Sequence, residues 1–382
     1  MQRCVIRSVN FNEDFSCFTC CPENGALVFN VNPLAYLGQL DGEKLGSLSS
    51  ASMLGRSNMF ALVGGGKTPK FAENAVIIWD EAKKDFVMEY AFNSPVLGVL
   101  LRKSGLVVLL QSSVQIFDFP GQPERRVARL DCWPAAGSAR GLASLSGKLL
   151  AFAARGQPGY AQLVRLDRLN SAPVLIHAHQ APLAALQLSP DGELLATAGS
   201  RGTLVRLFGT ANRRLLRQLR RGADPALLYS LAWSPASDWV CAASDKGTVH
   251  VWSVGSGAST SSFDQDADQH VASSSLSSAS STSSPQSSAA ASPVNHHSSS
   301  VAASLPSSGS GGKFLSDLVD GARADVTFSL PPDTRSCVAF VGPQCIVALT
   351  LDGAYQRYSF TQSCATRDAF DVFTDMALDS EF

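Results

Sequence analysis

Residues 189–208 read SPDGELLATAGSRGTLVRLF, and residues 234–253 read SPASDWVCAASDKGTVHVWS. The two stretches share a Ser-Pro pair, an apolar run and a Gly-Thr pair, all displaced by 45 residues. Each apolar run is bounded by turn residues, which is typical of short strands joined by tight turns. A period of about 40 to 45 residues with strand-type segments indicates the blades of a WD-type β-propeller.

A shorter pattern recurs along the whole chain: a turn followed by alternating β-forming residues that end on an aromatic side chain. It is found at residues 26–29, 76–80, 114–118, 162–167, 204–208, 249–252 and 354–358. The fourth of these segments is the weakest, because it ends on Leu166 instead of an aromatic residue. The sequence therefore predicts an all-β fold, a seven-bladed β-propeller of the WD40-like type, in which radial closure protects the sheet edges.

The regular spacing of these segments is interrupted once, by residues 255–312. Serine dominates this stretch, together with alanine and a few prolines. Such a composition buries too little apolar surface to offset the entropy lost on ordering. We therefore expect residues 255–312 to form a long disordered loop in blade six. Residues 1–254 are expected to form the propeller up to the first part of blade six, and residues 313–382 the remainder, including blade seven.

An apolar segment follows the Ser-rich stretch. Its four apolar side chains, spaced to share one helical face, are Phe314, Leu315, Leu318 and Val319. The segment either packs as the edge of the next blade or inserts into the interfacial region of a membrane.

The net charge of the chain is close to zero, with 31 basic and 32 acidic residues. Any attraction to a polyanion must therefore come from a local patch. Residues 199–222 form such a patch, since they contain seven arginines and no acidic residue. The patch is either an ordinary solvated strand edge or an anion site.

The Arg-Arg pair favours an anion site. Residues 215–221 are predicted to form an outer strand, and successive side chains of a strand leave from opposite faces. Arg220 and Arg221 would then point into different clefts between blades. Because a guanidinium grips a phosphate with two parallel hydrogen bonds, the pair predicts two neighbouring phosphate sites.

Hydroxyl, imidazole and basic side chains of the flanking repeats are candidate partners for these arginines. They are His179, Thr203 and Arg206 for one cleft, and Ser244, Lys246, Thr248 and His250 for the other. The alternative for His179 is structural, because many WD blades carry a histidine that only ties the blade together. Gly-Thr pairs are also common in turns.

The segment Leu219-Arg220-Arg221-Gly222 resembles the signature of the PROPPIN family, the WD-repeat phosphoinositide-interacting propellers of autophagy, in its Leu-Arg-Arg-Gly branch. Segments such as 11–18, 61–66 and 369–372 also resemble the family. The resemblance implies sites for phosphatidylinositol 3-phosphate and the 3,5-bisphosphate. The first site would use His179, Thr203, Arg206 and Arg220, and the second Arg221, Ser244, Lys246, Thr248 and His250. Gly199 stands where relatives often have a serine.

The same resemblance implies a peripheral membrane protein that takes part in autophagosome assembly. Family members place the blade-six loop against the membrane, and they bind an autophagic lipid-transfer protein through positions that match Asn12 and Asp14. The alternative for these two residues is an ordinary turn. The expected location is the cytoplasm, at the phagophore (preautophagosomal structure) or at endosomal membranes. The alternative function is a generic WD-repeat scaffold with a basic rim.

Several other functions are not favoured by the sequence. The chain shows no membrane-spanning run and no signal peptide, and its nine cysteines are an odd number that fits reduced thiols. We expect a monomeric protein that is not an enzyme and has no metal or other cofactor. The arginine patch lacks interleaved aromatic residues, so nucleic acid is not an expected partner. Residues 64–68, GGGKT, lack the spacing of a phosphate-binding loop and are predicted to form a hairpin turn.

Overall fold

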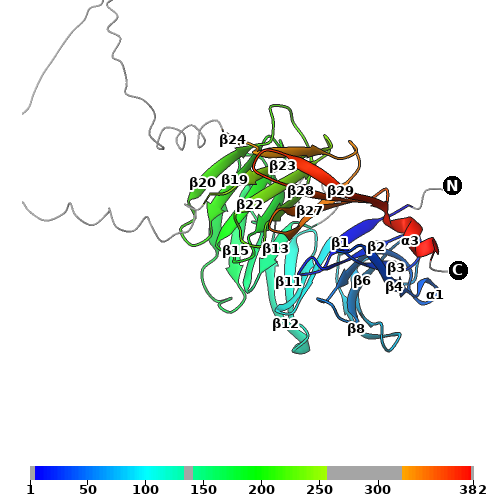
Figure 1. Ribbon diagram of the computed structural model, residues 1–382. Coiled ribbons are helices and arrows are strands. Elements are labelled where there is room, and N and C mark those ends of the chain that lie inside the picture. The colour runs from blue at the N-terminus through cyan, green and yellow to red at the C-terminus, as the bar shows by residue number, and fades with distance from the viewer. Residues whose placement is uncertain (1–4, 133–140, 256–320, 380–382) are drawn as a thin grey trace, which may run out of the picture.

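The computed structural model describes residues 5–132, 141–255 and 321–379. These residues form seven sheets, antiparallel except for one short parallel edge pairing, that are arranged radially as the blades of a β-propeller (Figure 1). The predicted fold class is therefore confirmed.

Each of the first four sheets contains four strands that follow one another in the chain. Blade one contains β1 (Ser8–Phe11), β2 (Cys17–Cys21), β3 (Ala26–Asn30) and β4 (Ala35–Leu40). Blade two contains β5 (Gly46–Met53), β6 (Met59–Pro69), β7 (Ala75–Asp80) and β8 (Asp85–Ala91). Blade three contains β9 (Gly98–Arg102), β10 (Gly105–Leu109), β11 (Ser113–Asp118) and β12 (Gln122–Asp131). Blade four contains β13 (Ala143–Ser146), β14 (Leu149–Ala153), β15 (Tyr160–Arg165) and β16 (Val174–His177).

The remaining three sheets are less regular. Blade five contains β17 (Leu183–Leu188), β18 (Leu194–Gly199), β19 (Leu204–Gly209), β20 (Leu215–Arg220) and, at its edge, β24 (Ala322–Arg323). Blade six contains β21 (Leu228–Trp233), β22 (Trp239–Ser244), β23 (Thr248–Ser253) and β25 (Val326–Ser329). Blade seven contains β26 (Ser336–Gly342), β27 (Cys345–Thr350), β28 (Ala354–Phe360) and β29 (Ala365–Val372). Two short helices complete the fold, α1 (Gly42–Leu45) and α3 (Phe373–Asp379).

The seven aromatic-ending segments of the sequence each form the third strand of a blade, not the last one. They correspond to β3, β7, β11, β15, β19, β23 and β28. The third strand is flanked by a strand on both sides, so its alternating apolar residues are buried. Leu166, the exception in the pattern, lies just after the end of β15.

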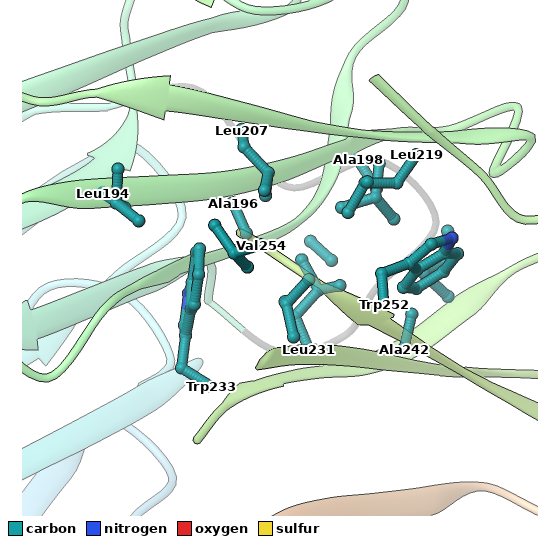
Figure 2. Close-up of a cluster of buried hydrophobic side chains, with 14 of the residues drawn as sticks. Leu194, Ala196, Ala198, Leu207, Leu219, Leu231, Trp233, Ala242, Trp252 and Val254 are labelled. Carbon is teal, nitrogen blue, oxygen red and sulfur yellow. The ribbon is translucent and has the colours of Figure 1, made fainter. Parts of the chain in front are cut away.

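The core is divided into seven clusters of apolar side chains, one between each pair of neighbouring blades. Figure 2 shows the cluster between blades five and six, where Leu219 of β20 lies near Trp252 of β23 and Ala242 of β22. Burial of a side chain such as Leu219, which is fully buried, contributes roughly 1.5–3 kcal/mol. This contribution fixes which face of β20 is turned toward blade six.

The ring closes without a strand shared between the two ends of the chain. The first blade contains only N-terminal strands and the last blade only C-terminal strands. A cluster that includes Phe18, Phe29 and Phe373 joins them, and the Tyr355 hydroxyl donates a 2.8 Å hydrogen bond to the Val31 carbonyl. The closure therefore depends on side-chain packing and on a few hydrogen bonds.

One predicted turn is wrong. Residues 64–68 lie inside the long strand β6 instead of forming a hairpin turn. Pairing with β5 continues through a register shift, from Leu48 opposite Gly64 to Gly46 opposite Pro69. The three glycines allow the irregular backbone that this shift needs, and Gly66 has a φ of 107°.

The predicted disordered loop at 255–312 lies outside the described residues, apart from Gly255. Residues 256–320 connect β23 to β24, which places the insertion between the third and fourth strands of blade six. The predicted boundary at residue 254 falls directly after β23. The division into 1–254, 255–312 and 313–382 otherwise remains a prediction.

Candidate functional site

The Arg-Arg pair lies at the end of β20, the outer strand of blade five. Leu219 on one face is fully buried in the cluster between blades five and six. The side chain of Arg220 leaves from the opposite face and is exposed, and Arg221 follows the strand with an 8% exposed side chain. Strand alternation thus separates the two guanidinium groups, as the sequence pattern indicates.

The face of blade five that carries Arg220 also carries Arg206. Antiparallel pairing sets Leu204 opposite Arg220, and Arg206 opposite Gln218. The Arg206 Nε donates to Gln218 Oε1 at 2.8 Å, and its Nη1 donates to the Ala178 carbonyl at 2.7 Å. Arg206 is therefore held rigidly between blades four and five, beside His179.

His179 is buried in this first cleft. Its Nε2 lies 3.0 Å from the Thr197 hydroxyl. Burial, together with the positive charge of Arg206, lowers the pKa of His179 to about 4. The neutral ring links the segment between blades four and five to β18, which is the structural role considered for His179 as the alternative. A role of His179 as a phosphate ligand remains a prediction.

Gly199 leaves room for this histidine. A Cβ atom at residue 199 would lie 3.2 Å from the Cβ and Cγ atoms of His179. A serine at this position would require the imidazole to shift by a few tenths of an ångström. The absence of a side chain at residue 199 is thus matched to the buried His179 ring.

Thr203 lies in the turn before β19 and is half-buried. Its carbonyl accepts backbone hydrogen bonds from Arg221 at 3.0 Å and Gly222 at 3.4 Å. The turn that carries Thr203 therefore holds the chain at the point where Arg221 leaves β20.

Arg221 forms the entrance of the second cleft. Its Nε donates to the Gly202 carbonyl at 2.7 Å, and its Nη2 donates to the Asp224 carbonyl. Burial lowers the pKa of Arg221, while the carboxylates of Asp245 and Asp224 oppose that shift. Neither of these two hydrogen bonds uses the Nη1 amino group of Arg221, which could donate to another acceptor.

The predicted partners of Arg221 lie on the hairpin of β22 and β23 in blade six. Burial and the charge of Arg221 lower the pKa of His250 to about 4, and its ring stacks on Trp252 with centroids 5.6 Å apart. Thr248 is half-buried at the start of β23, and Lys246 is exposed in the turn. The hairpin therefore places the His250 imidazole near the Arg221 guanidinium, with Thr248 on the same strand and Lys246 in the preceding turn.

Ser244 is the most informative residue of this cleft. Its side chain is 3% exposed, and its hydroxyl oxygen is buried without a hydrogen-bond partner in the described part of the chain. An unpaired buried hydroxyl costs about 1–3 kcal/mol. A phosphate oxygen would supply the missing partner.

Two residues of the site were not predicted from the sequence. Gln218 is buried and orients Arg206, and it could have been found by counting two residues back from Arg220 along the strand. Asp245 brings a carboxylate close to Arg221, and its buried Oδ1 has no hydrogen-bond partner among the described residues. No pattern in the sequence distinguishes Asp245 from an ordinary turn aspartate.

The predicted protein-contact residues lie far away along the chain, in the turn between β1 and β2. Asn12 is 2% exposed. Its side-chain amide accepts from the Cys17 backbone amide within the turn at 3.0 Å and donates to the carbonyl of Gly55, between β5 and β6 of blade two, at 2.9 Å. Asp14 is exposed and accepts from the Ser16 hydroxyl at 2.6 Å. Both residues shape the turn, and a contact with a partner protein remains a prediction.

The predicted membrane-inserting side chains, Phe314, Leu315, Leu318 and Val319, lie outside the described residues. Within the described part, no helix is long and apolar enough to cross a membrane. No group of three or more histidine, cysteine or acidic residues in that part could hold a metal ion.

The seven radial sheets define a protein of the β-propeller class. The chain belongs to the PROPPIN family of non-catalytic binding propellers, because a model of that family matches residues 5–272. The predicted family is confirmed.

Curated relatives agree with this assignment. The SVP1-like protein 2 of Emericella nidulans is 46% identical over 202 residues, which cover 53% of this chain and 62% of that protein. The SVP1-like protein 2 of Candida glabrata is 31% identical over 297 residues, covering 70% of this chain and 67% of the relative. The match thus spans less than two thirds of the Emericella protein.

Solved structures support the fold. Hsv2 of Kluyveromyces lactis superposes with a TM-score of 0.73 at 20% identity, over 97% of this chain and 99% of the other. KlAtg21, solved in complex with the coiled-coil of AgAtg16, gives a TM-score of 0.68 at 16% identity over the same shares of the two chains.

Proposed function

We propose that this protein is a phosphoinositide-binding effector, which docks on membranes bearing phosphatidylinositol 3-phosphate or the 3,5-bisphosphate and recruits autophagy and lipid-transfer machinery. Membership in the PROPPIN family supports this proposal. The protein would act peripherally from the cytoplasm, at the phagophore or at endosomal membranes.

The observation that carries the proposal is the placement of basic side chains on both faces of blade five. Arg220 and Arg206 lie on one face, and Arg221 lies toward His250 on the other. The unpaired Ser244 hydroxyl adds a donor that lacks an acceptor among the described residues. Two phosphate sites on one rim would raise the affinity for a membrane well above that of either site alone.

Liposome flotation tests the proposal. The double variant Arg220→Thr/Arg221→Thr should lose binding to vesicles that contain a 3-phosphoinositide. A matched control is Arg125→Thr/Arg126→Thr, because these two exposed arginines also form an adjacent pair on an outer strand, β12. If the rim variant floats as well as the parent protein, the proposal is wrong.

The competing function is a WD-repeat scaffold whose basic rim binds acidic protein segments. The same experiment separates the two functions, since a scaffold would show no selectivity for 3-phosphoinositide vesicles over vesicles of equal charge without that lipid. Loss of selectivity together with retained binding to acidic peptides would favour the scaffold.

The role proposed for the blade-six insertion needs a separate experiment. A variant that lacks residues 255–312 and carries Phe314→Ser and Leu315→Ser should bind vesicles more weakly but bind a soluble headgroup unchanged. A shallow apolar insertion strengthens membrane attachment without contacting the headgroup. Equal weakening in both assays would argue against insertion.

Recruitment of a lipid-transfer protein is the remaining step of the proposal. Asp14 is the exposed member of the predicted pair, so Asp14→Ala should weaken binding to such a partner while leaving vesicle binding intact. Asp85→Ala, at an exposed position on β8, is a suitable control. Unchanged partner binding by Asp14→Ala would remove Asp14 from the proposed contact.

A further inference from the structure

A cavity of about 340 Å³, lined by both apolar and polar residues, lies at one mouth of the central channel that the first strands of the blades surround, and none of the rim residues lines it. Its polar lining residues come mainly from the innermost strands β1 and β5 and from the connection before β26; they are Arg7, Ser8, Asn10, Ser49, Ser50 and Arg335. This volume falls at the lower end of the range for small-molecule sites.

Two buried polar atoms of the lining have no hydrogen-bond partner in the described part of the chain, Arg7 Nε and Ser8 Oγ. Ser8 is 2% exposed, so bulk water does not readily satisfy its hydroxyl. Both atoms are donors, and a guanidinium donor and a hydroxyl donor on adjacent residues fit an oxygen-rich anion.

The backbone leaves room for the arginine. A Cβ atom on Gly66 would lie 2.6 Å from both Cζ and Nε of Arg7, so the guanidinium group lies directly over this glycine. Any larger residue at position 66 would displace Arg7. The site is therefore built by the register shift in β6 as well as by the lining side chains.

The charge at the two mouths of the channel is opposite. The cavity with Arg7 and Arg335 has no carboxylate among its described lining residues. The cavity beyond the other end of β1, about 430 Å³ in volume, is lined by Glu13 and Asp14 together with Arg56. An anion entering the channel would thus be favoured at the first mouth only.

The carboxylate of Glu23 lies near Arg7, and Glu23 shares its charge with Lys67. Glu23 is close enough for Arg7 to contribute to the lowering of its pKa, but the main cause is its hydrogen bond with Lys67. The Lys67 Nζ lies 2.5 Å from Glu23 Oε1. The charge of Glu23 is therefore already paired.

We propose that the Arg7–Ser8 mouth of the channel binds a phosphoryl oxyanion, at a site separate from the two rim clefts. The phosphoryl group would belong either to free phosphate or to the headgroup of a phosphoinositide. Arg7 Nε and Ser8 Oγ would donate to its oxygens, and Arg335 would add a second positive charge.

The test uses the full chain with Arg220→Thr/Arg221→Thr, so that the rim clefts do not contribute. Inorganic phosphate is titrated at constant ionic strength in a calorimeter, and saturable binding is expected. Arg7→Ala and Ser8→Ala, added separately, should each weaken binding by about tenfold or more, with thermal unfolding recorded to confirm folding. Arg56→Ala, at the opposite mouth, is the matched control and should bind like its parent.

Vesicles containing a 3-phosphoinositide distinguish the source of the phosphoryl group. If the rim variant binds phosphate but not vesicles, the ligand is a free phosphate. If it binds vesicles and Arg7→Ala removes that binding, the ligand is a lipid headgroup. The proposal is overturned if no saturable binding of either probe is seen, or if folded Arg7→Ala and Ser8→Ala bind like their parent. Phosphate binding by this variant does not bear on the rim sites, because their arginines are absent; vesicle binding equal to that of the parent chain would instead count against the rim sites.

Discussion

Arg220 and Arg221 are adjacent in the sequence, but the fold holds them differently. Arg220 is exposed, whereas Arg221 is 8% exposed and donates to the carbonyls of Gly202 and Asp224. Arg220→Thr should therefore weaken 3-phosphoinositide binding with little change in stability. Arg221→Thr should weaken binding and also lower the free energy of unfolding by about 1–3 kcal/mol, because the buried Gly202 carbonyl and the partly buried Asp224 carbonyl lose a charged donor.

Urea unfolding and flotation of the two single variants check this difference. Each variant should retain part of the binding, because one cleft stays intact. Complete loss of binding in both would mean that the two arginines serve one site.

Ser244 allows function to be separated from stability. Ser244→Ala removes a buried hydroxyl that has no partner among the described residues, so the free energy of unfolding should stay the same or rise by up to about 1 kcal/mol. Headgroup affinity should nevertheless fall roughly tenfold, since a hydrogen bond to a charged phosphate contributes about 1.5 kcal/mol or more.

The comparison variant is Ser200→Ala, because Ser200 is exposed in the turn after β18. Calorimetric titration with a soluble 3-phosphoinositide headgroup measures both proteins. Parent-like affinity of Ser244→Ala would exclude its hydroxyl from the second site.

His179 makes stability depend on pH. Its pKa in the folded protein is about 4, below the ordinary value of 6.5, so the unfolded chain binds the proton first as the pH falls. The stabilising contribution is present above about pH 6.5 and is lost as the pH falls toward 4. A shift of this size corresponds to a loss on the order of 3 kcal/mol in the free energy of unfolding.

Urea unfolding at several pH values measures this dependence. His179→Asn should make the change between pH 6.5 and 4 shallower, whereas His177→Asn should not, because His177 is exposed. Parallel pH profiles for the parent and His179→Asn would show that the buried imidazole does not control the slope.

At the level of elements, the repeat pattern predicts the third strand of every blade, because that strand is flanked on both sides and needs alternating apolar residues. The pattern carries no signal for β24, a two-residue strand that pairs in parallel with Leu219 and Arg220 of β20. Such a short pairing is decided by tertiary contacts. The prediction of a turn at residues 64–68 was wrong for a related reason. Glycines occur at a register shift within a strand as well as in turns, and the sequence alone does not distinguish the two.

The same limit applies to the candidate site. The alternation of β20 was predictable, and it separates Arg220 from Arg221. The hydrogen bonds that hold Arg206 and His179 depend on Gln218 and Thr197, which come from neighbouring strands whose register the sequence does not specify.

The pairing of β24 with β20 fixes the end of the strand that carries Arg220, because Arg323 lies opposite Arg220 in the parallel ladder. Ala322 lies opposite Leu219 in the parallel ladder and belongs to the cluster between blades five and six. Ala322→Pro removes the backbone donor of residue 322 and should lower the free energy of unfolding by about 1–3 kcal/mol. Headgroup binding through Arg220 should weaken more than binding through Arg221.

Arg323→Ala is the control, since it keeps the backbone amide and Arg323 is exposed. Adding Ala322→Pro to each single arginine variant and titrating the headgroup shows which cleft is affected. A larger loss in the cleft of Arg221 would contradict the role assigned to β24.

For the whole molecule, the seam between blades one and seven is the place where the ring depends most on side chains. Among the described residues no strand crosses this seam, and β1 and α3 lie near one another there (Figure 1). Phe373, at the start of α3, is fully buried and packs edge-on against Phe18 and Phe29, with ring centroids 5.2 and 5.4 Å apart. The C-terminal helix therefore holds the first blade against the last.

Phe373→Ala should lower the free energy of unfolding by about 3–5 kcal/mol, because it leaves a cavity in the cluster that closes the ring. The matched control is Phe370→Ala, three residues earlier, whose side chain is 52% exposed and contacts Arg367. That control should change stability by less than about 1 kcal/mol. Equal destabilisation of the two variants in urea unfolding would show that closure does not depend on α3. A large effect of Phe373→Ala alone would show that the stability of the ring, and therefore the spacing of the rim sites, depends on the side-chain packing between blades one and seven.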